Sequence, residues 1–227
     1  MSDATLVLRL AGPMQSWGVK SRFDRRDTGT EPSKSGVVGL ICSALGRPRT
    51  ADVSDLSSLE MAVRVDRPGV LLADYQTTEG VPSASGTGGR RTVQSHRWFL
   101  ADAAFLVALR GQDQMVGEIA AALERPRWML ALGRKSFPPT PPLVIGLLEE
   151  DIDTALWETP WLGTAGRPQE EVTLRVVRDS RPDQAHAWRS DHPVSFEPRR
   201  FLRRPIRIEW VTLRGPLTER RLTWSSI

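Results

Sequence analysis

The sequence is poor in the residues on which catalysis and metal binding most often depend. Its 227 residues include one cysteine, one tyrosine and three histidines. The single cysteine, Cys42, excludes an intramolecular disulfide and any zinc site built on several cysteines. It lies in the apolar run 37–42, which predicts a small buried side chain. The chain also has no Walker sequence, no GxSxG elbow and no strand-bound GxGxxG, so it lacks the signatures of common nucleotide-binding and hydrolase folds.

Long apolar runs are missing as well. No segment approaches the roughly 18 uninterrupted apolar residues that a membrane helix needs. The start of the chain, Met1 to Thr5, lacks the basic region and apolar stretch of a signal peptide. We therefore expect a soluble, cytoplasmic protein with no membrane partner. At 227 residues the chain is long enough to bury a hydrophobic core without disulfides.

Lysine is scarce, although the chain is basic. Lys and Arg exceed Asp and Glu by 31 to 27, and the only lysines are Lys20, Lys34 and Lys135. Nearly all the positive charge is therefore arginine, whose planar guanidinium suits bidentate phosphate contacts and stacking on bases. A genome rich in GC enriches arginine equally well, so the arginine content alone decides nothing. The positions of the arginines are more informative.

The order of the expected strands and helices predicts an α+β fold. A strand over 5–10 runs into the turn-rich segment 11–18, and a helix over 36–45 is capped by Ser33 or Ser35 and stopped by Gly46. The remaining elements are a strand over 61–65 pairing with 70–75, an apolar run over 98–109, a helix over 114–123 and a strand near 128–132. This order is compatible with a ferredoxin-like (RRM-like) βαββαβ unit.

Two further features divide the chain. The segment Thr77 to Ser95 is small and rich in glycine, and strand-like sequence flanks it, so we expect a protruding hairpin or mobile loop. The proline-rich stretch 137–142 marks the end of a first domain, residues 1–142. Residues 143–227, with strands expected over 172–177 and 206–213, form a smaller β-rich region.

Few residues of the chain are candidates for catalysis or metal binding. His96 follows the glycine-rich segment and lies beside Arg97, where it is a candidate for a metal-independent ribonuclease, but a lone histidine in a basic strand is more often a surface or packing residue. His186 and His192 lack the i, i+4 spacing of a helical zinc pair. The acidic run 149–153 is the expected start of a helix. We predict no catalytic residue, no metal and no cofactor.

Several segments favour phosphate binding. Ser33, Lys34 and Ser35 precede Gly36 at a helix N-terminus, where backbone N–H groups, hydroxyls and an ammonium point to one spot; the alternative is a plain helix cap. The segment from Gly133 to Ser136 places two cations after a glycine, so the backbone can approach a ligand closely; the alternative is a solvated turn.

Other basic and aromatic residues extend this pattern. Arg90 and Arg91 give the protruding segment a basic tip, or belong to an ordinary surface loop. Trp17 offers a ring for base stacking, or lies at the edge of the core. The arginine-rich stretch 199–207 can contact nucleic acid or a partner subunit. Together these segments favour an RNA-binding module over an enzyme.

Two long motifs then resemble a known family. Residues 8–18 read LRLAGPMQSWG and residues 26–40 read RDTGTEPSKSGVVGL. Both are similar to the CasD family, the fifth Cas protein of type I-E CRISPR systems. Shorter matches follow in the family's order, at Asp74 to Thr77, at Thr92 to Ser95 with its continuation to Phe105, and at Leu132 to Ser136. The resemblance spans roughly residues 5 to 140.

The resemblance implies a fold and a role. Members of this family have a ferredoxin-like domain with a β-hairpin thumb and a smaller C-terminal part, and they cap the 5′ handle of the crRNA. They assemble with a backbone subunit and with the large subunit that reads the protospacer-adjacent motif (PAM), close to the PAM-proximal end of the target DNA. The implied thumb is the hairpin of about residues 77–95. The implied RNA-binding residues are Met14, Gln15, Ser16, Trp17, Arg26, Thr28, Ser33, Lys34, Ser35, Arg90, Arg91, Arg134, Lys135 and Ser136.

Two rival readings stay open. Relatives in type I-C systems cleave the repeat RNA with a Tyr, Lys and His constellation; here Tyr75 and His96 are the candidates, and no Lys-His pair adjoins the tyrosine. The second rival is an assembly subunit whose basic patches contact only protein. The sequence and the resemblance together predict a non-catalytic, handle-binding subunit of the type I-E Cascade complex.

Overall fold

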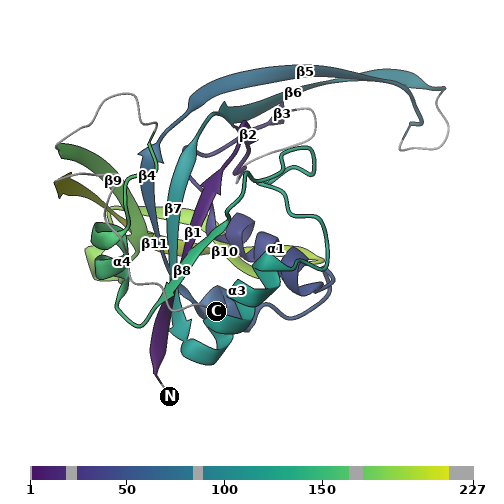
Figure 1. The fold of residues 1–227 in the computed structure, drawn as a ribbon. Helices are drawn as coiled ribbons and strands as arrows, with labels where there is room; N and C mark the ends of the chain where they lie inside the picture. The colour runs from purple at the N-terminus through teal and green to yellow at the C-terminus, as the bar shows by residue number, and fades with distance from the viewer. Residues whose placement is uncertain (1, 19–24, 84–88, 164–170, 215–227) are drawn as a thin grey trace.

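A seven-stranded antiparallel sheet forms the body of the protein (Figure 1). The computed structural model describes residues 2–18, 25–83, 89–163 and 171–214. The order of the strands in the sheet is β10-β11-β9-β4-β7-β1-β8. A smaller sheet, β2-β6-β3 with β5 added beside β6, adjoins it. The mixed α+β class predicted from the sequence is confirmed.

Four strands and two helices of the body follow the predicted βαββαβ order. The strands are β1 (Asp3–Ala11), β4 (Glu60–Arg67), β7 (Ala104–Gln112) and β8 (Val144–Leu148), and the helices are α1 (Lys34–Leu45) and α3 (Asp113–Glu124). Within the sheet they stand as β4-β7-β1-β8, and every pair is antiparallel. This is the connectivity of a split βαβ, and it is consistent with the predicted ferredoxin-like unit.

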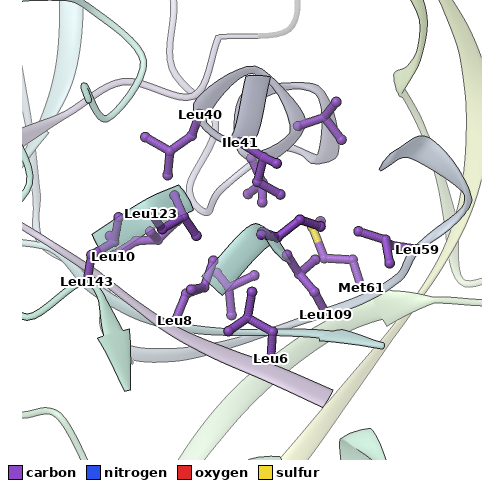
Figure 2. Packing of buried hydrophobic residues seen from close by; sticks show 14 of the residues in the cluster. Leu6, Leu8, Leu10, Leu40, Ile41, Leu59, Met61, Leu109, Leu123 and Leu143 are labelled. Atoms are coloured by element: carbon purple, nitrogen blue, oxygen red, sulfur yellow. The ribbon is translucent and has the colours of Figure 1, made fainter. Parts of the chain in front are cut away.

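Alternation along β1 explains why helices cover both faces of this sheet. Leu6, Leu8 and Leu10 lie in the larger core cluster with residues of α1, α3 and the short α2 (Ser54–Ser58), and Figure 2 shows this packing. Val7, between them, lies in a second cluster with residues of α4 (Ile152–Glu158). Because successive side chains of a strand point to opposite faces, a strand buried on both faces reads as one apolar run.

The predicted boundaries of α1 are confirmed in detail. The Ser33 hydroxyl accepts a hydrogen bond from the backbone N–H of Gly36, and Gly46 closes the helix with a left-handed φ of 71°. The helix over 114–123 is also confirmed, as α3. Asp151 caps α4, as expected from the acidic run 149–153. Cys42 is buried, and burial raises the pKa of its thiol to about 11.

Two strand predictions are wrong. Residues 70–75 do not pair with β4; they begin β5 (Val70–Val81), which pairs instead with β6 (Arg91–Ala101). The apolar run 98–109 is therefore divided between β6 and β7, with Asp102 between them at a φ of 53°. Residues 128–132 form no strand, and the last strand of the βαββαβ order is β8 instead. A short apolar run does not by itself indicate which strand it pairs with.

The β5–β6 hairpin projects from the body as a long, curved arm (Figure 1). It is longer than predicted, since the paired strands begin at Val70 and end at Ala101 rather than spanning only about 77–95. Residues 84–88 of the predicted hairpin lie outside the described residues. Two short strands, β2 (Met14–Gln15) and β3 (Arg25–Arg26), pair with β6 at the base of the arm.

The later part of the chain extends the main sheet. Its strands β9 (Glu171–Asp179), β10 (Ala187–Phe196) and β11 (Arg199–Arg214) include the predicted stretches 172–177 and 206–213, and a short 3-10 helix, Pro182–Gln184, joins β9 to β10. β9 pairs with β4, so this β-rich region shares its sheet with the region before residue 142. The division at residue 142 remains a prediction. Among the described helices, none is long and apolar enough to cross a membrane.

Candidate nucleic-acid interface

Trp17 forms the centre of the turn that follows β1. Its side chain is only 1% exposed, and its indole N–H donates to Gln15 Oε1 at 3.1 Å. Its ring packs on Gly36, where a Cβ atom would lie 2.8 Å from the ring. Of the two alternatives for Trp17, the place in the core is therefore confirmed, and its implied role as a base-stacking residue is corrected, because its ring has no face open to solvent. It is instead the packing residue that fixes the turn against α1.

Gln15 and Thr28 also point inward. The Gln15 amide donates to the carbonyls of Leu10 and Ala103, and Gln15 is fully buried. The Thr28 hydroxyl accepts a hydrogen bond from the backbone N–H of Trp17 at 2.8 Å. The predicted RNA contact of the buried Gln15 side chain is corrected accordingly, whereas that of the half-buried Thr28 stays a prediction. Both groups join the segments 14–17 and 26–29 to each other and to the core.

The N-terminus of α1 is tied to the C-terminal strands. The backbone N–H of Lys34 donates to Asp191 at 2.9 Å, and the Lys34 ammonium lies 2.8 Å from Asp179. Lys34 is only 5% exposed. The prediction that this ammonium faces a phosphate is thus wrong, because the ammonium is buried and the half-buried carboxylate of Asp179 already neutralises it. The Ser33 hydroxyl is likewise used as the helix cap.

Arg204 completes a buried ion network with these groups. Its guanidinium contacts both Asp179 and Asp191. Burial alone would raise the pKa of Asp191, but the hydrogen bonds and positive charge of Arg204 outweigh it, so the pKa lies below its ordinary value. Glu31, just before α1, is held in the same way by Arg175 and Arg189, and its pKa is also lowered against the effect of burial. The loop before α1 is therefore anchored by partners about 145 to 160 residues further along the chain.

A cationic cleft of about 390 Å³ opens beside this anchored loop. Arg26, Arg134 and Arg199 line it, and Asp27 is the one acidic residue among its described lining. Ser16, Ser35 and the backbone of Gly36 also line it, so several hydrogen-bond donors face the same space. Segments near residues 16, 26, 35, 134 and 199 meet here, although they are far apart in the sequence.

Arg134 is the best-positioned cation of the cationic cleft. It donates to the Trp98 carbonyl at 2.8 Å, and its guanidinium lies 5.4 Å from the centre of the Phe137 ring. Burial, followed by the neighbouring charges of Arg97 and Arg26, lowers the pKa of Arg134. Guanidinium groups stay protonated in proteins, so Arg134 remains a partly buried cation in the cleft.

A glycine sets the position of this arginine. Gly133 adopts a φ of 92°, and a Cβ atom there would lie 1.8 Å from the Ser16 carbonyl oxygen. The backbone N–H of Ser16 also donates to Leu132 at 3.0 Å. The predicted close approach at this glycine is therefore to the protein's own turn at residue 16. The side chains after it, Lys135 and Ser136, are exposed.

The remaining predicted residues lie elsewhere. Met14 is half-buried at the base of the arm, in β2. Arg90 and Arg91 are exposed on the β5–β6 hairpin, and they do not line the cationic cleft. One aromatic residue of the cleft, Phe196, was missed, whereas Phe201 lies within the predicted stretch 199–207; the two form an edge-on pair at 6.1 Å, and Arg199 lies over Phe201 at 5.4 Å. The arginine-rich stretch 199–207 was the only sequence signal near them.

Tyr75 and His96, the candidates for nuclease chemistry, are neighbours. They face each other across β5 and β6, and their ring centroids lie 5.2 Å apart on the exposed surface of the arm. No lysine among the described residues contacts the pair: Lys34 is tied to Asp179, and Lys135 belongs to the loop after Gly133. Within the described ranges, no group of three or more His, Cys, Asp or Glu side chains could hold a metal ion.

Comparison with known proteins places the chain in a family. A family model described as CRISPR-associated protein (Cas_Cas5) matches residues 5–207. The CRISPR system Cascade subunit CasD of Escherichia coli (strain K12) is 34% identical over 226 residues, covering 92% of this chain and 96% of that protein. The chain belongs to the Cas5 family of CRISPR-associated proteins, and within it resembles CasD, as the sequence motifs indicated.

Solved structures agree with this assignment. A chain of a CRISPR RNA-guided surveillance complex superposes with a TM-score of 0.80 at 34% identity, covering 94% of this chain and 92% of that one. The crystal structure of a Cas protein superposes with a TM-score of 0.74 at 42% identity, covering 93% and 99%.

Proposed function

We propose that this protein is a non-catalytic subunit of the type I-E CRISPR Cascade surveillance complex, where it binds and caps the 5′ handle of the crRNA in antiviral defence. The observation that carries the proposal is the cationic cleft, in which Arg26, Arg134 and Arg199 converge with a single acidic neighbour. The similarity to a Cascade subunit and to a chain of an RNA-guided surveillance complex supports the assembly part of the proposal.

The cationic cleft has the properties that a hooked single strand requires. Its guanidinium groups and hydroxyls suit phosphate oxygens, and the ring edges of Phe196 and Phe201 offer apolar contact for an unstacked base. The contact set differs from the one predicted from sequence. Ser16, Arg26, Ser35 and Arg134 stay in it, Lys135 follows Arg134 at its margin, and Arg199 and Phe201 from the predicted stretch 199–207 join them.

The β5–β6 hairpin is proposed as the thumb. Its exposed Arg90 and Arg91 would follow the guide next to the backbone subunit, while the body faces the large PAM-reading subunit near the PAM-proximal end of the target DNA. Specificity for DNA would then come from pairing with the guide RNA rather than from these residues.

The experiment is a titration of the full-length protein with fluorescent handle RNA and with an RNA of permuted sequence. Arg134→Ala should weaken handle binding about tenfold or more, and Lys135→Ala less, because Lys135 lies at the margin of the cleft. Arg181→Ala, an exposed arginine outside the cleft, is the matched control and should bind like the wild type. Equal affinity of the wild type for both RNAs would contradict handle recognition.

A metal-independent crRNA-processing ribonuclease is the second candidate, because Tyr75 and His96 lie side by side. That function requires a discrete cleavage product in EDTA that disappears in His96→Ala. The proposed cap predicts intact RNA in the same samples. A product that depends on His96 would make this protein the processing enzyme.

A further inference from the structure

The chain enters the β5–β6 hairpin through a bulge at Asp66. Val65 and Arg67 of β4 lie opposite consecutive residues of β7, so Asp66 is an extra residue without a partner in that ladder. A bulge of this kind bends its strand and changes the direction of the chain. β5 begins four residues later, at Val70. The conformation at Asp66 therefore helps to set the direction in which the arm leaves the main sheet (Figure 1).

A buried arginine holds this bulge. The Arg64 side chain is fully buried, and its Nε and Nη2 atoms donate to the two carboxylate oxygens of Asp66 at 2.7 Å and 2.8 Å. Its Nη1 donates to the carbonyls of Leu156 and Thr159, and its Nη2 also donates to the carbonyl of Pro160. All five N–H donors of the guanidinium are therefore used, within a single arrangement of β4 and the end of α4.

The segment after α4 closes over the ion pair. The backbone N–H of Leu162 donates to Asp66 Oδ2 at 2.7 Å, and the indole N–H of Trp161 donates to the Asp66 carbonyl at 3.0 Å. Both the side chain and the backbone of the bulge are thus bonded to this segment. We call Arg64, Asp66 and the segment 156–163 the bulge lock; it joins parts of the chain that are 92 to 96 residues apart.

The returning strand of the arm is held by a different set of contacts. The backbone N–H of Asp102, just after β6, donates to the Pro13 carbonyl at 3.1 Å, and the Gln15 amide donates to the Ala103 carbonyl at 2.8 Å. These contacts come from the turn after β1. The arm therefore has two separate anchors, and the bulge lock is the one on its entering strand.

We infer that Arg64 is a positioning residue, which fixes the angle between the arm and the body through the bulge lock. Both charges of the Arg64–Asp66 pair have lost their hydration, and this loss offsets most of their attraction. A buried pair of this kind adds little net stability over apolar side chains of the same volume. Its geometry is specific, however, because a planar guanidinium with five bonded donors loses hydrogen bonds when its partners rotate.

The angle of the arm has a consequence for RNA binding. The cationic cleft adjoins the base of the arm, since Arg134 donates to the Trp98 carbonyl of β6 at 2.8 Å. One RNA strand can contact both the cleft and the arm only over a limited range of angles. This consequence rests on the proposed function, whereas the control of the angle by Arg64 does not.

The test measures the distance between two spin labels by double electron–electron resonance in the full-length protein without RNA. The labels are attached at Gln94→Cys on the arm and at Gln114→Cys on α3, two exposed positions, in a Cys42→Ala background. This parent protein should give one narrow distribution of distances. Arg64→Met should roughly double the width of that distribution, because the bulge is no longer held in one conformation.

Two further variants keep the test decisive. Arg64→Met combined with Asp66→Asn leaves no unpaired buried charge, so it should fold even where the single variant does not, and it should give the same broad distribution. Arg64→Lys keeps the positive charge but has three donors in place of five, and should also broaden the distribution. A narrow distribution in Arg64→Lys and in the double variant would overturn the inference.

Arg178→Met is the matched control. Arg178 also ties α4 to the sheet, but its ion pairs are with Asp153, Glu60 and Glu209, none of which belongs to the bulge lock. Its loss should lower the unfolding free energy in urea and leave the distance distribution unchanged.

The outcomes separate this inference from the proposed function. If the Arg64 variants lose stability but keep the parent distribution, or if the parent distribution is already as broad as theirs, Arg64 is a core residue and does not position the arm. If the wild type binds the handle RNA no better than a permuted RNA, the proposed function fails and the result for the arm still stands.

Discussion

The start of α1 and the β5–β6 hairpin both carry polar and basic residues between small ones, yet they differ in how those residues are used. At the start of α1, Ser33 and Lys34 are buried and bonded to the protein itself. On the hairpin, Arg90 and Arg91 are exposed and line no part of the cationic cleft. The difference lies in what surrounds them: α1 packs on the main sheet and its start is bonded to Asp179 of β9 and Asp191 of β10, whereas the arm projects away from the body (Figure 1). The first region is therefore a scaffold, and the second is a surface for partners.

The largest effect on the unfolding free energy is expected at the start of α1, in the scaffold. Asp191→Ala removes the carboxylate that Arg204 and the Lys34 backbone share, and leaves buried donors without an acceptor. Breaking a buried ion pair in this way costs about 3–5 kcal/mol of unfolding free energy. Urea denaturation of the wild type and variant measures it. A loss under about 1 kcal/mol would mean that the network does not anchor the loop.

The buried carboxylates of Asp191 and Glu31 predict that the unfolding free energy depends on pH. The folded state lowers the pKa of Asp191 from 3.8 and that of Glu31 from 4.5, so the stability that these groups add is present above the ordinary values and is lost as the pH falls through the lowered ones. The unfolding free energy should therefore decrease as the pH falls below about 4. Asp191→Asn should flatten that decrease. An unchanged slope would show that Asp191 does not carry the effect.

A smaller effect is expected where the scaffold meets the cleft. In Gly133→Ala the added Cβ would collide with the Ser16 carbonyl, and the φ of 92° is strained for alanine. Strain of this kind costs about 1–3 kcal/mol, and relief by a shift of the loop would also displace Arg134. We expect lower stability together with weaker handle binding. Gly117→Ala, where an added Cβ meets nothing within 4 Å, is the control in a helix.

The smallest effect is expected on the arm. Arg90→Ala and Arg91→Ala should leave the unfolding free energy unchanged, because both side chains are exposed. If each arginine contacts a phosphate of the RNA, its loss should reduce by about 1 the slope of log affinity for RNA against log salt concentration, measured by titration at several salt concentrations. Gly89→Ala, with open space around the added Cβ, controls for changes in the hairpin backbone. A large loss of stability in Arg91→Ala would contradict the division into scaffold and partner surface.

Local chemistry explains which features the sequence could predict. The ends of α1 followed from a serine cap and a left-handed glycine, which act within a few residues. The strand that pairs with β5 could not be predicted in this way. Nor could the burial of Lys34, because it depends on a contact with Asp179, 145 residues away. The sequence left two alternatives for Trp17, base stacking or the core edge, and only its packing against Gly36 decides between them. For the cleft, the segments were identified, including the arginine-rich stretch that contains Phe201, but Phe196 carries no local signal of binding.

Photocrosslinking tests the central claim most directly. Handle RNA with 4-thiouridine at successive positions would be crosslinked to the full-length protein and the modified peptides mapped. The account predicts crosslinks in the segments around Arg26, Arg134 and Arg199, which meet in the cationic cleft. Crosslinks concentrated on α4 and the opposite face of the sheet would contradict it.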